Sequence, residues 1–232
     1  MVKSTSENAL TNSQKKKKPE RPSRRSAPKS RTRVQLGSKR VPALPVTAVF
    51  LVGFMGAGKT SVGRALGHRL NWIFEDLDDR IQQRDGRTIA EIFRDSGELE
   101  FRRSEHAALR ELIEELHAGV AKVVALGGGA FVQPGNTALL KKSRAKTVFL
   151  DAPVEELWHR CCQQANEAGT ERPLLQSQTQ FVELHRARRK IYLNASRTIE
   201  TGGRSIEAVA TDLIQQLGLR KLEIRTQQGE IE

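Results

Sequence analysis

The sequence predicts an α/β fold, in which helices cover both faces of a parallel β-sheet. Five short segments are apolar and rich in β-branched or aromatic residues, and helical patterns alternate with them. Strands and helices that alternate in this way form parallel sheets. The five expected strands span 47–52, 73–74, 120–126, 146–150 and 198–200.

The first expected strand, Thr47–Val52, is continuously apolar, as is typical of a strand buried on both faces, and it ends at Gly53. After the second strand, helical stretches are broken at Asp85–Gly86 and at Ser96–Gly97. The polar stretch 166–178 has no periodicity, so we expect a loop there. The clearer helical patterns span 59–70, 107–116, 153–164, 179–193 and 206–217.

The charge of the chain is concentrated at one end. The net charge is +12, but residues 1–45 hold 13 Lys/Arg and only two Asp/Glu, so this segment accounts for +11 and leaves +1 for residues 46–232. A segment this polar buries too little apolar surface to offset the entropy of ordering it. We therefore expect 1–45 to be a disordered basic extension, 46–218 to be the folded domain and 219–232 to be a C-terminal tail.

Three interpretations of the basic extension stay open. It is a solubilising segment, a basic arm for nucleic acid or another acidic partner, or an organelle transit peptide, although its lysine run and two glutamates speak against the last. The nearly neutral domain itself is not expected to bind nucleic acid.

Cysteine usage and hydropathy favour a cytoplasmic location. The two cysteines, Cys161 and Cys162, are adjacent and cannot join distant segments, which excludes a disulfide scaffold and favours a reducing compartment. The sequence holds no apolar run of about 18 residues, so no membrane helix is expected. We expect a monomer.

A phosphate-binding loop is the strongest motif. Residues 53–60, GFMGAGKT, fit the pattern G-x-x-x-x-G-K-[ST] between an expected strand and an expected helix. Glycines let backbone N–H groups turn toward a phosphate, and the following helix directs its positive end at the same anion. Lys59 would reach the β- and γ-phosphates of ATP, and the Thr60 hydroxyl would bind Mg²⁺. The expected ATP-binding residues here are Gly56, Ala57, Gly58, Lys59, Thr60 and Ser61.

Two carboxylates follow the second strand, where ligands bind in open α/β sheets. Asp76 and Asp78 are two residues apart, so both can face the crevice that holds the γ-phosphate. One would support Mg²⁺ through water, and the other would orient an attacking hydroxyl or accept its proton. The alternative is that either aspartate caps the next helix.

Arginines and glycines complete the candidate site. Arg102 could pair with a substrate carboxylate, or with Glu98 and Glu105 on a solvated helix face. Gly127–Gly129 end a central strand, which suits a ligand that lies against the backbone. Arg172 lies in the 166–178 loop, where an active-site lid would place it near transferred phosphate.

In this order, the segments resemble shikimate kinase over about residues 47–217. The match includes GFMGAGKTSVGRAL, FEDLDDRI, GRTIAEIFRDSGELEFRRSE, ALGGGA, ERPLL and RARRKIY. The stretch from Asp76 to Arg103 is the most specific, because it lies outside the motif that P-loop proteins share. The resemblance implies a three-layer α/β/α fold of the nucleoside-monophosphate-kinase type, with a five-stranded parallel sheet, and transfer of the γ-phosphate of ATP to the 3-hydroxyl of shikimate.

The resemblance also implies roles for single residues. Asp78 would bind the reacting hydroxyl, Asp76 would support Mg²⁺ through water, and residues 77–105 and 166–178 would be the substrate-binding segment and the lid. Arg102 and Arg188 would bind the shikimate carboxylate, with Arg188 chosen over Arg189 because it stands four residues before Tyr192. The remaining implied contacts are the backbone of Gly127, Gly128 and Gly129 to substrate, Arg172 to the phosphates and Arg204 to adenine.

Two departures and two rival functions accompany this resemblance. Ile206 stands where the adenine loop of the family usually has a proline, and the basic extension has no counterpart in a compact member. The rivals are another small-molecule kinase on the same fold, such as a gluconate or nucleotide kinase, and a basic nucleic-acid-binding protein with a regulatory P-loop.

Overall fold

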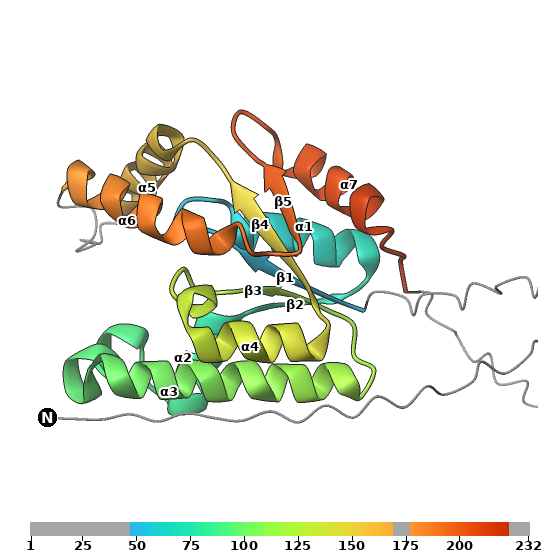
Figure 1. Cartoon of the computed structure of the whole chain (residues 1–232), viewed down its shortest axis with the longest axis horizontal. Coiled ribbons are helices and arrows are strands. Elements are labelled where there is room, and N and C mark those ends of the chain that lie inside the picture. Colours follow the sequence, from blue (N-terminus) through green and yellow to red (C-terminus); the bar gives the residue numbers. More distant parts are fainter. Residues whose placement is uncertain (1–46, 169–176, 223–232) are drawn as a thin grey trace, which may run out of the picture. The chain divides into compact units, whose positions relative to one another are not determined.

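The sheet of the computed structural model has five parallel strands in the order β2-β3-β1-β4-β5 (Figure 1). The structure describes residues 47–168 and 177–222. The predicted α/β/α class with a five-stranded parallel sheet is confirmed. The strands are β1 (Ala48–Val52), β2 (Ile73–Asp76), β3 (Lys122–Ala125), β4 (Lys146–Asp151) and β5 (Arg197–Glu200).

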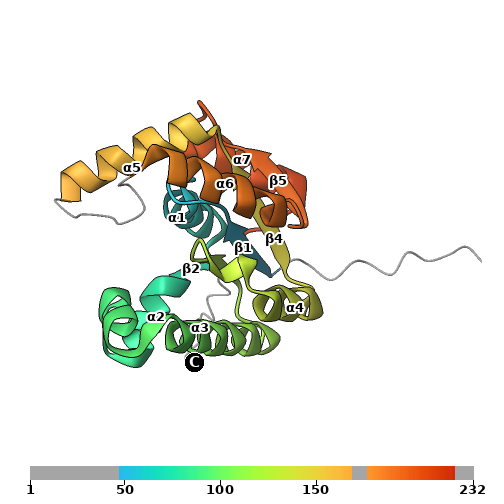
Figure 2. The ribbon, with the colours of Figure 1, turned by 60° about the vertical axis from the view of Figure 1, so that its left-hand side comes forward.

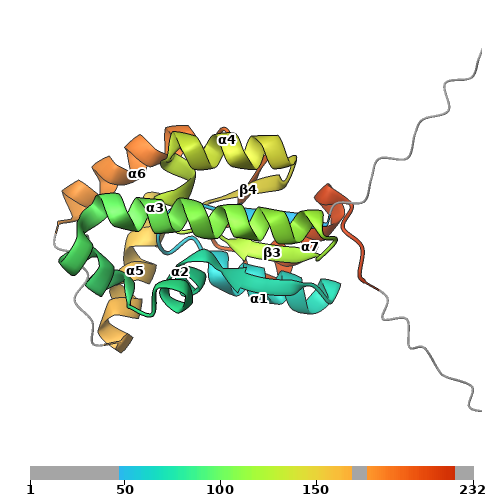
Figure 3. The same ribbon diagram turned by 90° about the horizontal axis from the view of Figure 1, so that it is seen from below.

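Helices cover both faces of the sheet. In Figure 3, α4 and α6 lie on one side of the strands and α1 lies on the other, where it packs against α7. Figure 2 shows α5 beside α6, and α2 packs against α3 near the β2 edge. The helices are α1 (Lys59–Leu70), α2 (Leu77–Asp85), α3 (Ile89–His117), α4 (Pro134–Ser143), α5 (Val154–Ala168), α6 (Gln178–Tyr192) and α7 (Ile206–Leu217), and the 3₁₀ turn η1 spans Ala130–Val132.

The central strand β1 explains why the site forms where it does. All five of its residues are buried, as expected for a strand covered on both faces. Leu51 is in register with Ala125 of β3, and the same Ala125 is in register with Asp76 of β2. The carboxyl ends of β1, β2 and β3 therefore lie at one edge of the sheet. The phosphate loop, the aspartate pair and the triple glycine all begin at this edge.

Helix α3 begins at Ile89 and consists of two helical segments that meet at a kink. Thr88 begins it with a capping box, in which its side chain bonds the Glu91 N–H and the Glu91 carboxylate bonds the Thr88 N–H. The predicted break at Ser96–Gly97 is present as a kink, since Gly97 has φ 76°. The break at Asp85–Gly86 is the end of α2, where Gly86 adopts φ 66°.

The remaining differences concern residues 120–178. The sequence shows no helical pattern between 130 and 145, where η1 and α4 lie, because α4 buries only Asn136 and Leu140 and has little amphipathic character. Strand β3 is shorter than 120–126. The expected loop 166–178 includes the last residues of α5, which continues to Ala168, and the first residue of α6, Gln178. Its centre, 169–176, lies outside the described residues, as do the 1–45 extension and residues 223–232 of the tail.

Within the part of the chain that the structure describes, no helix combines the length and the apolar character that crossing a membrane requires.

Candidate active site

The phosphate loop connects β1 to α1 and holds the lysine of its motif close to its own backbone. Gly56 and Gly58 adopt φ 77° and 84°, the left-handed region that glycine tolerates best. The Lys59 Nζ donates to the carbonyl oxygens of Gly53 and Phe54, each at 3.0 Å. Burial lowers the pKa of Lys59, and the nearby carboxylates of the aspartate pair oppose this shift. The loop therefore presents one ammonium group to a pair of acids.

Asp76 caps α2, the alternative that its sequence position left open, and also contacts Thr60. Its Oδ2 accepts a hydrogen bond from the Thr60 hydroxyl at 3.0 Å, which links β2 to the start of α1. Its Oδ1 accepts from the backbone N–H of Asp78 at 3.1 Å and so caps α2. Capping thus directs one oxygen to the helix and leaves the other beside the Thr60 hydroxyl. Together these two side chains offer hard oxygen donors of the kind that Mg²⁺ prefers.

Asp78 is a carboxylate whose proton affinity has been raised by its surroundings. Burial is the main cause and the charge of Asp76 the next, while Lys59 opposes both, so that the pKa of Asp78 rises to about 6. The group remains ionised at neutral pH but is more basic than an ordinary aspartate. That property suits a side chain that orients a hydroxyl and accepts its proton.

The triple glycine lets two of these side chains approach the backbone. A Cβ atom on Gly127 would lie 2.5 Å from the Asp78 Oδ1, and a Cβ on Gly129 would lie 2.8 Å from the Arg102 Nη1. Neither position has room for a side chain while Asp78 and Arg102 stay in place. The absence of a side chain at Gly127 and Gly129 therefore has a steric reason, which is the close approach of Asp78 and Arg102.

Arg188 approaches the same glycine segment from α6. A Cβ on Gly128 would lie 3.5 Å from the Arg188 Nη1, and the Gly128 carbonyl accepts a hydrogen bond from the Tyr192 hydroxyl. The Arg188 guanidinium carbon lies 5.9 Å from the ring centre of Phe54 in the phosphate loop. The structure thus brings Arg188 between the phosphate loop and the glycine segment.

The neighbouring Arg189 has a different position. Its guanidinium pairs with the buried Asp151 carboxylate at the end of β4, with the shortest contact 2.6 Å. Of the two adjacent arginines, Arg188 is therefore the one that lies at the glycine segment.

Arg102 makes the acidic contacts that the sequence offered as the alternative to substrate binding. It lies 3.1 Å from Glu98 Oε1 and 3.0 Å from Glu105 Oε1. Glu98 is exposed, whereas the Glu105 side chain is only 1% exposed. The Arg102 guanidinium carbon also lies 5.0 Å from the ring centre of Phe101. These contacts fix the arginine at Gly129. Arg102 therefore pairs with acidic residues of its own helix and also faces the glycine segment.

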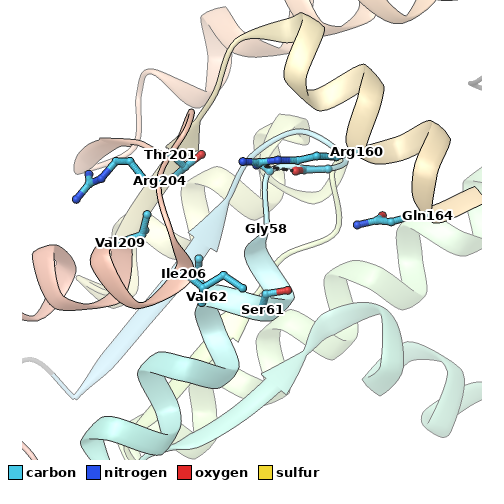
Figure 4. A pocket seen from close by; sticks show the side chains of 11 residues that line it. Gly58, Ser61, Val62, Arg160, Gln164, Thr201, Arg204, Ile206 and Val209 are labelled. Carbon is cyan, nitrogen blue, oxygen red and sulfur yellow. Dashed lines mark hydrogen bonds between the residues drawn. The ribbon is translucent and has the colours of Figure 1, made fainter. Parts of the chain in front are cut away.

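A pocket lies between α5 and the segment before α7, and the phosphate loop forms part of its lining (Figure 4). Arg160 donates to the Gly56 carbonyl at 3.3 Å and pairs with Glu156. Arg204 lines the pocket, but its guanidinium points away from Arg160 in Figure 4 and bonds the Glu200 carbonyl and Asp212. The residues that line this pocket are Gly56, Ala57, Gly58, Ser61, Val62, Arg160, Gln164, Thr201, Arg204, Ile206 and Val209.

Several residues of this site carry no recognisable signal in the sequence. Arg160 and Gln164 lie one turn apart on α5, and no motif marks them. Glu105 was considered only as a solvated partner of Arg102, although it is buried. Tyr192 served only to choose between two arginines. Arg172 lies outside the described residues, so its role stays a prediction.

Comparison with known proteins identifies relatives that cover most of the described domain. A family model for shikimate kinase matches residues 55–218. A curated shikimate kinase of Geobacter sulfurreducens is 40% identical over 169 residues, which is 71% of this chain and 87% of the relative.

Solved structures agree with these sequence relatives. A shikimate kinase from Acinetobacter baumannii in complex with shikimate is 37% identical, with a TM-score of 0.65 over 74% of this chain and 93% of the other. A shikimate kinase from Bacteroides thetaiotaomicron is 31% identical, with a TM-score of 0.65 over 75% of this chain and 99% of the other.

Proposed function

Because this chain belongs to the shikimate kinase family and is a shikimate kinase, we propose how its residues transfer the γ-phosphoryl group of ATP to the 3-hydroxyl of shikimate. One observation carries the proposal. Asp78, Arg102 and Arg188, from three different helices, all lie against the backbone of Gly127–Gly129.

Asp78 acts on the acceptor. Its carboxylate accepts a hydrogen bond from the reacting hydroxyl, orients the oxygen toward the phosphate and takes up the proton as the new P–O bond forms. The pKa of about 6 suits this role, because the group is ionised at neutral pH and holds a proton more tightly than an ordinary aspartate. Phosphoryl transfer needs positioning and charge neutralisation more than covalent catalysis, so one oriented carboxylate suffices.

Arg102 and Arg188 bind the carboxylate of shikimate. A guanidinium group presents parallel N–H donors that match the two oxygens of a carboxylate. The ring of the substrate then lies along Gly127–Gly129, where a side chain would collide with Asp78 or Arg102. This arrangement selects a compact acid over a longer sugar acid or a nucleotide.

The donor lies on the phosphate loop. The backbone from Gly56 to Ser61 binds the phosphates of ATP, and Lys59 exchanges its two loop carbonyls for β- and γ-phosphate oxygens. The adenine occupies the pocket between α5 and α7, with Arg160 on one side and the Arg204–Ile206 segment on the other. Arg172, by its place in the resemblance, neutralises charge on the transferred group.

A magnesium ion fits the donor set of this crevice. The Thr60 hydroxyl would bind it directly, and Asp76 would support it through water. When bound, Mg²⁺ neutralises negative charge on the β- and γ-phosphates.

Replacing Asp78 with Asn tests the proposed catalytic role. The amide has nearly the same shape but cannot take up the proton, so we expect kcat to fall by roughly 10²–10⁴-fold while the fold is kept. The control is Asp79→Asn, which removes an exposed carboxylate on the adjacent residue and should leave kcat unchanged. A kcat near the wild-type value in Asp78→Asn would remove Asp78 from the mechanism.

A further inference from the structure

We infer that Asn136 is a positioning residue, which holds Arg102 at a fixed place against the glycine segment. Arg102 and Arg188, which together bind the substrate carboxylate, are called the carboxylate clamp below. The inference rests on the proposed role of Arg102 in binding the shikimate carboxylate. Asn136 lies on α4, the helix that the sequence pattern did not reveal, and it need not touch substrate.

The side-chain amide of Asn136 connects two parts of the crevice. Asn136 is only 1% exposed, and its Nδ2 donates to the Ala130 carbonyl at 3.1 Å and to Glu105 Oε2 at 3.3 Å. Ala130 directly follows Gly129, the glycine against which Arg102 lies. Glu105 in turn receives two contacts from the Arg102 Nη1, at 3.0 and 3.2 Å. One amide group thus contacts both the partner of the arginine and the backbone beside the arginine.

Two acceptors fix which way this amide points. The Ala130 carbonyl oxygen and the Glu105 carboxylate can only accept hydrogen bonds, so the donor end of the amide, Nδ2, faces them. The Asn136 Oδ1 then lies 2.8 Å from the Nδ1 of His106, and this contact is a hydrogen bond in the His106 tautomer that carries its proton on Nδ1. The opposite orientation would direct the amide oxygen at a buried carboxylate and leave two acceptors facing each other, which is costly in a dry interior.

Glu105 needs this partner because it is buried. Burial, and to a smaller extent the charge of Asp78, raise the pKa of Glu105, while Arg102 and the hydrogen bond from the Asn136 amide oppose this shift. A buried carboxylate with too few donors is destabilised and can gain a proton. Glu105 would then attract Arg102 less, and the guanidinium would lie less firmly at Gly129. Asn136 therefore acts on substrate through the charge and the position of the Glu105–Arg102 pair.

A purely structural role for Asn136 makes a different prediction. If Asn136 only joined α4 to α3, its loss would weaken every ligand of the crevice alike. If it acts through Arg102, its loss weakens only the ligand that carries a charged carboxylate. The methyl ester of shikimate keeps the ring and the hydroxyls but has no negative charge, so it separates the two roles.

The test uses the full chain and isothermal titration with shikimate and with its methyl ester. Asn136→Leu keeps the branched shape of the side chain, although it is larger, and removes the hydrogen bonds. Asn136→Ser, a smaller change, serves if the first variant folds poorly. We expect the Kd for shikimate to rise about tenfold, the equivalent of about 1.4 kcal/mol, and the Kd for the ester to change less than about twofold. An equal loss for both compounds, or no loss for shikimate, would overturn the inference.

Two control variants distinguish a failure of the proposed role of Asn136 from a failure of the proposed binding of the substrate carboxylate by Arg102. Thr137→Val removes hydrogen bonds from the next residue of α4 to the carbonyls of Phe131 and Gln133, without touching Glu105, and should leave both Kd values unchanged. Arg102→Met should weaken shikimate far more than the ester. If it weakens both alike, the clamp itself is wrong. If Arg102→Met is selective for shikimate and the Asn136 variants are not, only the role of Asn136 fails.

Discussion

Adding one methyl group at Gly127 should displace the carboxylate of Asp78, the proposed catalytic residue, with little effect on the rest of the fold. A Cβ at this position would lie 2.5 Å from the Asp78 Oδ1, whereas contacts under 3.0 Å are essentially never seen. The backbone of Gly127 is outside the left-handed region, so alanine is compatible with its conformation. The Gly127→Ala variant therefore tests the position of Asp78 separately from its chemistry.

The expected size of the effect follows from this distance. The Asp78 carboxylate must move by at least about 0.5 Å to clear the new methyl group. A misplacement of about 1 Å can cost roughly 10²-fold in rate. We therefore expect kcat to fall about 10- to 100-fold. The free energy of unfolding should change little. Alanine has a smaller backbone entropy than glycine in the unfolded chain, and this contributes about 0.4–1 kcal/mol of stability, which offsets part of the strain.

The assay is ADP release at saturating shikimate and MgATP, coupled to NADH oxidation. Gly135→Ala is the matched control, since its Cβ would lie 3.7 Å from the nearest atoms, on His106, and it should keep the wild-type kcat. Gly129→Ala is a second comparison. Its Cβ would meet the flexible end of Arg102, so the KM for shikimate should rise more than kcat falls. A kcat within twofold of wild type in Gly127→Ala would refute the reasoning.

Four further predictions concern charge and domain boundaries. For wild type, kcat/KM should fall tenfold per pH unit below about pH 6, where Asp78 gains its proton, and this limb should be absent in Asp78→Asn. Because the pKa of Asp78 rises from its ordinary value of 3.8 to about 6 in the folded protein, its ionisation lowers stability progressively between these pH values and fully above them. Asp78→Asn should therefore be more stable at pH 7.5 by ~1–3 kcal/mol, and equal Tm values there would contradict this. Lys59→Met should lower turnover at least about 100-fold with the Tm retained, because the phosphates lose their buried ammonium; a smaller loss would place Lys59 outside the phosphate site. Deletion of residues 1–45 should leave kcat and both KM values within about twofold, and loss of turnover would tie the basic segment to catalysis.

The parallel sheet and the phosphate loop could be predicted because local pattern determines them. Thr47–Val52 is apolar throughout, and a strand of this kind has few alternatives to the centre of a covered sheet. The glycines of the loop carry their own conformational signal. Helix α4 could not be predicted in the same way, since its buried face consists mainly of one asparagine and one leucine.

The candidate site could be predicted only where a side chain follows a strand end. Asp76 is the last residue of β2, and Asp78 follows two residues later. Topology alone therefore places both of them near the phosphate loop. The depth at which Glu105 is buried, and its contact with Asn136, depend on how α4 packs against α3. These are tertiary contacts between segments about 30 residues apart, and no periodicity in either segment signals them.

The net charge shows why composition must be read by segment. The total of +12 suggests a nucleic-acid partner, but all except +1 of it belongs to residues 1–45. The described domain instead places its charges in pairs, such as Arg189 with Asp151 and Arg102 with Glu105. Both of these arginines are therefore held by acidic partners within the fold.

The most direct test of the whole account is the choice of acceptor. ADP release by the wild-type enzyme would be measured with MgATP and, in turn, shikimate, gluconate and a set of nucleoside monophosphates, and the product would be identified by phosphorus NMR. The account predicts turnover with shikimate alone and a phosphate on its 3-hydroxyl. A higher kcat/KM with a sugar acid or a nucleotide would contradict the assignment of Asp78, Arg102, Arg188 and Gly127–Gly129 to shikimate.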